Sequence, residues 1–419
     1  MLYLIALLCT SSAAATTWTA ITVFDPPNEE LIIRNIAVAV DGFVDPDMEF
    51  FTSDGYDESG SGQAALLYKY HGSSFSSRYV IADDFPPGET DFYLPAMTTQ
   101  DNDDYLYLTT RYWNSTESQF NLRELIVDRD TPTTTPSPEE DKEVANDNDS
   151  KEVKHSSLVL DAANDDLQAC FSREIPVLND DTYGNHRDLS GAWQSTEDTI
   201  GGTATDNQEH CDVAILSGGG RVIVYQQANA GADDILVRFE STVGTEDYTV
   251  NITSGSLDKF SWPTVAVRTI GTTETVHVAA KSNNGTGTIS IKYRSCVPAV
   301  AASCNGAGDW TTQLAVEQGN SYDPEYVHLA VDDIGTVYAV YADNAPLVDN
   351  DRVRVSHLCA NATTAFVDDG LVDDGADGEH FAQDGNVTGG SGRAYHTIAI
   401  NDDASKVRVV YIRDDDTSP

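Results

Sequence analysis

The side chains best suited to ligand binding recur at one position of a repeated strand pattern. Each repeat has a strand with a small or apolar residue at a fixed position, which we call the slot. The residue four positions before that slot is histidine or aromatic in five repeats, at His155, His210, Trp262, Tyr326 and Tyr395. Aromatic rings with polar tips stack on sugars and grip peptide side chains. These residues are predicted to ring the mouth of a central channel and bind a ligand; the alternative is that they plug the channel.

A second candidate site is an acidic loop late in the chain. Asp373, Asp377 and Asp384 place carboxylates at the first, fifth and twelfth positions of a calcium-binding loop, with Gly378 at the sixth. Gly375 at the third position departs from that pattern, and the flanks are not helical. The loop therefore predicts a Ca²⁺ site, with a solvated acidic turn as the alternative.

Paired acids that could act as general acid and base occur in turns, at 101–104 and 165–166. Aspartate is favoured in turns because it forms local hydrogen bonds. Glycosidic hydrolysis also depends on a separation between two carboxyl groups that a sequence does not give. No catalytic residue is assigned from these pairs.

The elements that position these groups are short strands. Each unit has an apolar strand with small residues, a turn and a second apolar strand, as at 213–215 and 222–225. The slots lie 52 to 69 residues apart, at Ala39, Thr98, Val159, Ala214, Ala266, Ala330 and Ala399. Such units predict an all-β, seven-bladed β-propeller, with six blades as the alternative.

The first strand of each unit alternates small and large apolar residues, which suits a strand packed between neighbouring blades. Residues 17–24 resemble the fourth strand expected at 310–316. We therefore expect the N-terminal strand to close the ring by completing the blade that 395–413 begin. One strand of that blade stays unassigned: either residues 2–8 supply it, or that blade has three strands, or the sequence is truncated.

The charge balance is strongly acidic. There are 68 acidic and 24 basic side chains, a formal charge of −44, while 40% of residues are hydrophobic. This charge opposes binding to nucleic acid or anionic lipid. It favours a halophilic or marine source, in which salt screens self-repulsion; dedicated calcium storage is the alternative.

The ends and one internal segment bear on domain organisation. Residues 1–15 are predicted to be a secretory signal peptide, although no basic residue precedes the apolar run, and a blade strand is the alternative. Residues 16–419 are then a single propeller. Its Pro/Thr-rich and acidic stretch at 130–152 is predicted to be a disordered insertion, with a domain boundary as the alternative. No later stretch has the length of a membrane helix.

Cysteine and glycosylation patterns agree with secretion or an extracellular surface. Cys296 and Cys304 flank a short connection in one repeat, and Cys170 and Cys211 fall in consecutive repeats, so both pairs are candidate disulfides. Cys359 is left without a partner if Cys9 is removed with the signal. Six N-X-S/T sites allow a glycoprotein, at Asn114, Asn148, Asn251, Asn284, Asn361 and Asn386.

The stretch 323–344, DPEYVHLAVDDIGTVYAVYADN, resembles the repeat unit of sialidase-like propellers with bacterial-neuraminidase-type repeats. The segments Gly-Asp-Trp at 308–310 and Gly-Ala-Trp at 191–193 are similar to eroded forms of the Asp-box of that family. The resemblance covers most of the chain with loose motifs. It implies six or seven blades and carries no activity.

Catalytic sialidases of this class have an arginine triad, a Tyr-Glu nucleophile pair and an acid/base aspartate. Only Arg173, in the segment 171–176, is similar to their Arg-Ile-Pro motif, and the triad cannot be placed. We therefore expect a non-catalytic propeller that binds a glycan or an extracellular protein. The alternatives are a sialidase-like glycoside hydrolase and a calcium-stabilised adhesive repeat protein.

Overall fold

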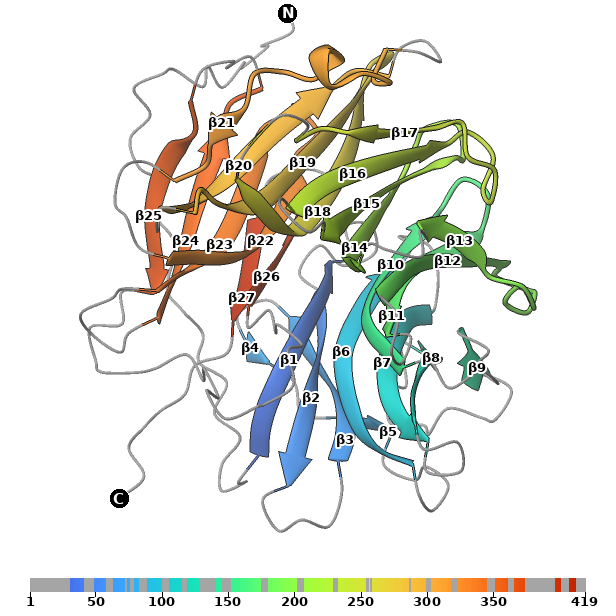
Figure 1. The fold of residues 1–419 in the computed structure, drawn as a ribbon. Coiled ribbons are helices and arrows are strands. Elements are labelled where there is room, and N and C mark those ends of the chain that lie inside the picture. The colour runs from blue at the N-terminus through green and yellow to red at the C-terminus, as the bar shows by residue number, and fades with distance from the viewer. Residues whose placement is uncertain are drawn as a thin grey trace, which may run out of the picture.

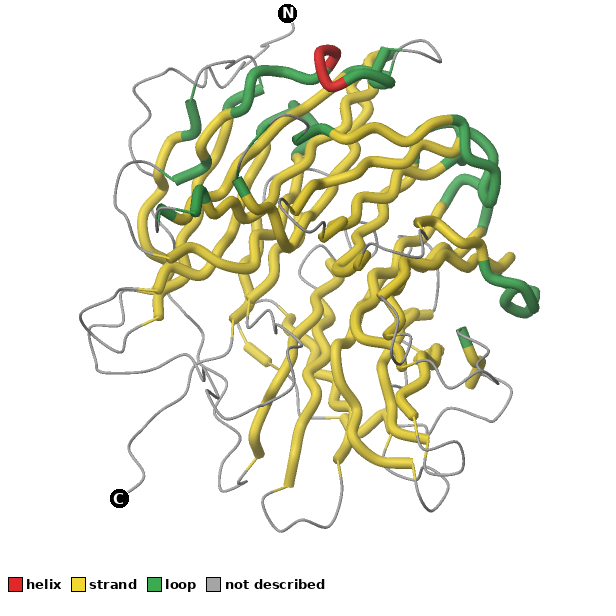
Figure 2. The backbone as a smooth tube through the Cα atoms, viewed as in Figure 1, coloured by secondary structure: helices red, strands yellow, loops and turns green. Residues whose placement is uncertain are grey.

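Most of the described chain is β-strand (Figure 2). The computed structural model describes residues 31–40, 49–57, 63–71, 74–75, 79–82, 89–99, 105–114, 119–128, 141–144, 152–174, 180–201, 207–228, 233–253, 256, 258–285, 288–298, 303–317, 323–344, 351–360, 365–373, 396–400 and 407–411. In this part of the chain the single helix is a 3₁₀ turn, Ala307–Asp309. None of these residues forms a helix of the length and apolarity that crossing a membrane requires.

Five antiparallel sheets have four strands each, paired in chain order as in propeller blades (Figure 1). Their strands are β6 (Glu89–Thr99), β7 (Tyr105–Asn114), β8 (Gln119–Asp128) and β9 (Asp141–Glu143); β10 (Glu152–Asp161), β11 (Asp166–Glu174), β12 (Asp180–Asp188) and β13 (Asp198–Gly201); β14 (Asn207–Ile215), β15 (Arg221–Ala228), β16 (Asp233–Glu240) and β17 (Tyr248–Asn251); β18 (Lys259–Ile270), β19 (Thr273–Asn283), β20 (Ile289–Cys296) and β21 (Leu314–Ala315); and β22 (Asp323–Val331), β23 (Val337–Asn344), β24 (Asp351–Leu358) and β25 (Val367–Asp373).

Two further sheets depart from this pattern. The first contains β1 (Leu31–Val40), β2 (Glu49–Asp57), β3 (Gln63–His71), β4 (Ser74–Phe75) and β5 (Tyr79–Ala82), and it has five strands because β3 pairs with both β4 and β5. The last contains β26 (His396–Ile400) and β27 (Val407–Tyr411). The protein is therefore an all-β propeller.

The blade count differs from the prediction. The described residues form five four-stranded blades, not the seven or six expected. The difference arises at the two ends, where the first outer strand is split into two short pieces and the last sheet has two described strands. The predicted closure by an N-terminal strand falls on residues 2–8 and 17–24, outside the described residues. So does the predicted signal peptide at 1–15.

The first strands of the sheets lie next to one another in the middle of the molecule (Figure 1). Each contacts the first strand of the next sheet, in the order β1, β6, β10, β14, β18, β22 and β26, and β26 also contacts β1. We refer to these as the inner strands. They bring residues from distant parts of the sequence to one place.

The core lies between successive sheets. One cluster joins β14–β17 to β18–β20 through Val222, Val237 and Val276, which are fully buried, and through the smaller Ala214. Similar clusters join β6–β9 to β10–β13, β10–β13 to β14–β17, β18–β21 to β22–β25, and β22–β25 to β26–β27. The expected packing of small against large apolar residues is confirmed, and each buried valine contributes about 1.5–3 kcal/mol.

Buried ion pairs and a disulfide also join blades. Arg187 of β12 donates through Nε to Glu124 of β8 over 2.8 Å, and the Nη2 group of Arg187 contacts the same carboxylate. Arg221 of β15 binds Glu240 of β16 at 2.7 Å and Asp198 of β13 at 2.9 Å. Removing one partner of such a pair strongly destabilises the fold because the other charge is then left buried and unpaired.

The predicted disulfides are confirmed. Cys170 of β11 bonds to Cys211 of β14 across two blades, and Cys296 bonds to Cys304 within one. Cys359 is also disulfide-bonded. Its partner lies outside the described residues, so the expectation that Cys359 is left over does not apply to this structure.

Part of the predicted insertion is ordered. Residues 141–143, within 130–152, form β9 and pair with β8. Val144 is fully buried, and its N–H donates to the carbonyl of Leu122 at 3.0 Å. This segment is the fourth strand of its blade. Residues 152 onward form β10, and 130–140 and 145–151 lie outside the described residues.

Candidate functional site

The inner strands share an irregularity at the same point of the repeat. In several of them, the pairing with the second strand slips near the residue four positions before the slot. The slips lie between Ile33 and Asn35, Val153 and His155, Glu209 and Cys211, Ser261 and Thr264, and Glu325 and His328. A β-bulge re-aims a side chain and is common beside functional sites.

Three of the predicted site residues have left-handed backbones at these bulges. The φ angles are 48° at His210, 54° at Trp262 and 52° at Tyr326. A positive φ is rare for a bulky side chain because its Cβ crowds the backbone. Each such residue costs about 1–3 kcal/mol and persists only where the surrounding structure enforces it.

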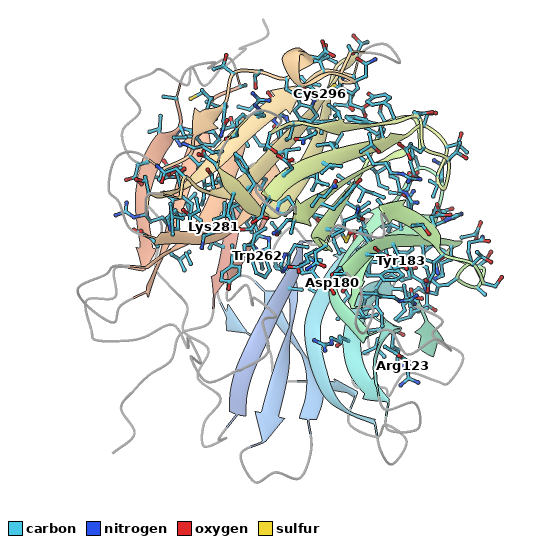
Figure 3. All side chains as sticks on the ribbon, viewed as in Figure 1. Arg123, Asp180, Tyr183, Trp262, Lys281 and Cys296 are labelled. Carbon is cyan, nitrogen blue, oxygen red and sulfur yellow. A yellow bond between two sulfur atoms is a disulfide. The ribbon has the colours of Figure 1, made fainter. Side chains whose placement is uncertain are left out.

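Four predicted site residues are brought together. The rings of His155 and His210 are 5.8 Å apart, those of His210 and Trp262 are 3.5 Å apart, and those of Trp262 and Tyr326 are 4.8 Å apart, measured between ring centres. We call these four residues the aromatic row. Trp262 lies in the middle of the molecule, where the inner strands meet (Figure 3).

The rings of the aromatic row pack at steep angles to one another rather than as one flat platform: two of the three contacts are edge to face and the third is tilted. The interplanar angles are 76° for His155 and His210, 40° for His210 and Trp262, and 72° for Trp262 and Tyr326. All four residues are half-buried. Each residue of the row therefore contacts a neighbouring ring and is itself partly exposed to solvent.

Polar groups orient His210. Its Nδ1 lies 3.1 Å from Oε1 of Gln226 on β15, and because an amide oxygen only accepts, Nδ1 is the donor. The carboxylate of Glu209 lies 3.8 Å from the same nitrogen, and its side chain is 30% exposed. Glu209 is thus a carboxylate beside the row that solvent or a ligand can reach.

The histidine at the other end of the row is in a covered environment. Nδ1 of His155 is fully buried and has no hydrogen-bond partner among the described residues. Burial lowers the pKa of His155 to about 4, although the nearby carboxylate of Asp212 acts in the opposite direction. His155 is therefore neutral at physiological pH.

Other predicted site residues are not placed in this group. Tyr395, Asp377 and Asp384 lie outside the described residues, and Asp373 is the last residue of β25, with a side chain that is not described. Among the described residues, no three His, Cys, Asp or Glu side chains are grouped so as to hold a metal ion. The calcium site stays a prediction.

Arg173 has a structural partner, and the paired acids are not placed in the aromatic row. Arg173 forms a two-point pair with Glu197, at 2.6 and 2.5 Å, and is almost fully buried. Asp165 and Asp166 lie at the turn from β10 to β11, at the opposite end of β10 from His155. Residues 101–104 lie outside the described residues.

One carboxyl group outside the row has a strongly shifted pKa. Burial raises the pKa of Glu317 to about 7, although the backbone N–H of Ile291 donates to its carboxylate at 2.7 Å. Glu317 follows β21, at the boundary with the next blade. A carboxyl group with such a pKa suits general acid catalysis, but Glu317 is not part of the aromatic row.

Sequence reasoning missed the bulges and one residue beneath the row. Asp212 accepts hydrogen bonds from two neighbouring inner strands. Its only signal in the sequence is its position, two residues after His210, as Thr264 stands two residues after Trp262.

Comparisons with known proteins show the fold alone. No protein-family model matches the chain, and no curated protein matches it. Among solved structures, an α-L-arabinofuranosidase from Fusarium graminearum bound to an iminosugar inhibitor is 14% identical, with a TM-score of 0.53 over 79% of this chain and 94% of that one. The same fold occurs in a complex of the GH93 α-L-arabinofuranosidase of that fungus with arabinobiose, at 15% identity and a TM-score of 0.52 over 80% and 96%.

A protein of unknown function from Dyadobacter fermentans is 12% identical, with a TM-score of 0.51 over 80% of this chain and 96% of that one. Such low identities establish a β-propeller and no activity. The narrower sialidase-like assignment stays a prediction.

Proposed function

We propose that this protein acts on glycans as a glycoside hydrolase, with the sugar bound at the aromatic row. The observation that carries the proposal is the left-handed backbone of His210, Trp262 and Tyr326 on three successive inner strands. A plug needs only bulky side chains, which an ordinary extended strand also supplies. Strain repeated at one position is the mark of a site in which side-chain direction matters.

The choice of glycan has two supports. Aromatic rings next to polar groups are typical of sugar sites, and the row is joined by Glu209 and Gln226. Two similar propellers are named as α-L-arabinofuranosidases, one bound to arabinobiose and one to an iminosugar inhibitor. This similarity of fold makes α-L-arabinosides the first substrates to test.

Hydrolysis requires two carboxyl groups on either side of the scissile bond. Glu209 precedes His210 on β14, and Glu325 holds the corresponding position before Tyr326 on β22. These strands contact the two sides of β18, which carries Trp262. We assign Glu209 and Glu325 as the candidate carboxylates.

The test is sugar release from a panel of arabinan, arabinobiose, arabinoxylan and sialyllactose. Glu209→Gln and Glu325→Gln should each lower kcat at least 100-fold, and Trp262→Ala should raise KM at least tenfold. Tyr105→Ala is the matched control, because Tyr105 is 42% exposed at the opposite end of its blade. A wild-type chain without activity on any panel glycan, or a Tyr105→Ala effect equal to that of Trp262→Ala, contradicts the proposal.

Binding without catalysis is the second candidate. It is favoured by the packing of the rings on one another, which restricts the surface open to substrate. In that case a panel glycan binds with a measurable Kd and is not hydrolysed. Trp262→Ala weakens this binding, and Glu209→Gln and Glu325→Gln change only the affinity.

We also propose that the protein is secreted or on an extracellular surface. The two described disulfides support this, because disulfides persist in oxidising compartments. Detection of the chain only in the cytosolic fraction of its source cells would contradict it.

A further inference from the structure

A layer of polar residues follows the aromatic row along the inner strands. Each member stands two residues after a member of the row: Ser157 on β10, Asp212 on β14, Thr264 on β18 and His328 on β22. The same four strands therefore supply both layers.

Asp212 is the centre of this layer. Its Oδ1 accepts from Oγ of Ser157 at 2.6 Å and from its neighbour Val213 N–H at 2.9 Å. Its Oδ2 accepts from Oγ1 of Thr264 and from the N–H of Val265, both at 2.9 Å. One carboxylate thus ties three successive blades together.

The four donors occupy the hydrogen-bonding capacity of the carboxylate, which has about four lone-pair sites. Hydrogen bonds to an ionised acceptor are about twice as strong as neutral ones. Asp212 is therefore suited to holding neighbouring strands together.

The tethered residues also place the rings. Ser157 and Thr264 follow His155 and Trp262 by two residues, and Asp212 follows His210 by the same interval, so the tether lies next to all three bulges. The ring centres of His210 and Trp262 are 3.5 Å apart, and this distance is kept only if β14 and β18 do not slide along each other.

We propose that Asp212 is the positioning residue of the aromatic row, holding His155, His210 and Trp262 in register through its bonds to Ser157 and Thr264. The positioning itself does not depend on the bound molecule. Its consequence for glycan affinity rests on the proposed function.

The test uses the fluorescence of Trp262, obtained as the difference between each variant and the same variant carrying Trp262→Phe. Acrylamide is the quencher, because a neutral molecule is not repelled by a chain of charge −44. Asp212→Asn replaces one acceptor oxygen by a donor and removes two of the four hydrogen bonds. We expect the quenching constant of Trp262 to rise at least twofold and its emission maximum to shift.

Asp332→Asn is the matched control. Asp332 is also buried and accepts from backbone N–H groups of Ile334 and Thr336, but at the far end of β22. Asp332→Asn should lower the melting temperature without changing the quenching of Trp262. Thr264→Val, which keeps the shape and loses one bond, should reproduce the Asp212→Asn quenching in part and serves if Asp212→Asn does not fold.

Two outcomes overturn the inference. In one, Asp212→Asn lowers the melting temperature while Trp262 is quenched as in the wild type, which makes Asp212 merely structural. In the other, Asp332→Asn changes Trp262 as much as Asp212→Asn. If no panel glycan binds the wild type, the proposed function fails, but the quenching still decides the role of Asp212.

Discussion

In an ordinary strand alanine is more stable than glycine. The left-handed backbone at Trp262 predicts the opposite order for the stabilities of Trp262→Gly and Trp262→Ala. Trp262→Gly and Trp262→Ala remove the same indole contacts, including the one with His210. The two variants differ by a single Cβ atom. At a φ of 54° that atom crowds the backbone, whereas glycine adopts this conformation freely.

The magnitude follows from two opposing terms. A left-handed residue with a Cβ costs about 1–2 kcal/mol. Glycine in an ordinary strand is less favourable than alanine by about 0.5–1 kcal/mol. At Trp262 the glycine variant should therefore be the more stable by about 0.5–1 kcal/mol. At Val267, on the same strand but not left-handed, alanine should be the more stable by about 0.5–1 kcal/mol.

Urea unfolding of the four variants measures both differences, provided that the dependence on denaturant is unchanged within each pair. The argument requires the stability difference between the glycine and alanine variants to have opposite signs at Trp262 and at Val267. If alanine is the better residue at both positions, the bulge relaxes when the indole is removed and the surrounding structure does not enforce the strain. The proposed function then loses its main support.

Three further predictions concern stability. Glu240→Gln removes the fully buried carboxylate that pairs with both Arg221 and Arg238, which keep only the more exposed Asp198 and Glu246, and should cost about 3–5 kcal/mol in urea unfolding; a loss under 1 kcal/mol contradicts the role of this network. Replacing Cys170 and Cys211 by serine removes a cross-link over 41 residues and should cost about 4 kcal/mol, which calorimetry under oxidising conditions tests against the wild type. The pKa of His155, about 4 in the folded protein against about 6.5 unfolded, means that the unfolded chain binds the extra proton. Its contribution is present above pH 6.5 and lost as the pH falls to 4, by up to about 3 kcal/mol. His155→Gln should flatten that pH dependence, and an unchanged slope would refute the assignment.

Much of the architecture could be predicted from the sequence because blades repeat a local pattern. Alternating small and large residues around Ala214 and Ala330 reflect packing between sheets, and this packing is found. The two disulfide pairs followed from their places in the repeats. The aromatic row was visible because its four members hold the same position of the pattern.

The blade count and the outer strands were harder to predict because they carry little pattern. The fourth strand expected at 310–316 is present only as the two residues of β21, and β9 is the polar sequence Asp-Lys-Glu, which pairs through its backbone and is anchored by Val144. β9 does not show the apolar alternation that identifies a strand. The bulges were invisible for another reason, since left-handed positions are usually marked by glycine, and here they hold His210, Trp262 and Tyr326.

The strain in the aromatic row is large compared with the stability of a protein. Three left-handed residues at about 1–3 kcal/mol each amount to several kcal/mol, while folded proteins are typically stable by about 5–15 kcal/mol. The structure offsets this cost close to where it arises. His210 is followed by Cys211, which is bonded to the neighbouring blade, and then by Asp212, which is bonded to two inner strands. A strand that is tied on consecutive residues has no freedom to relax its bulge. Such tethers are unnecessary for filling a channel, and they are what a site needs if the direction of its rings decides what it binds.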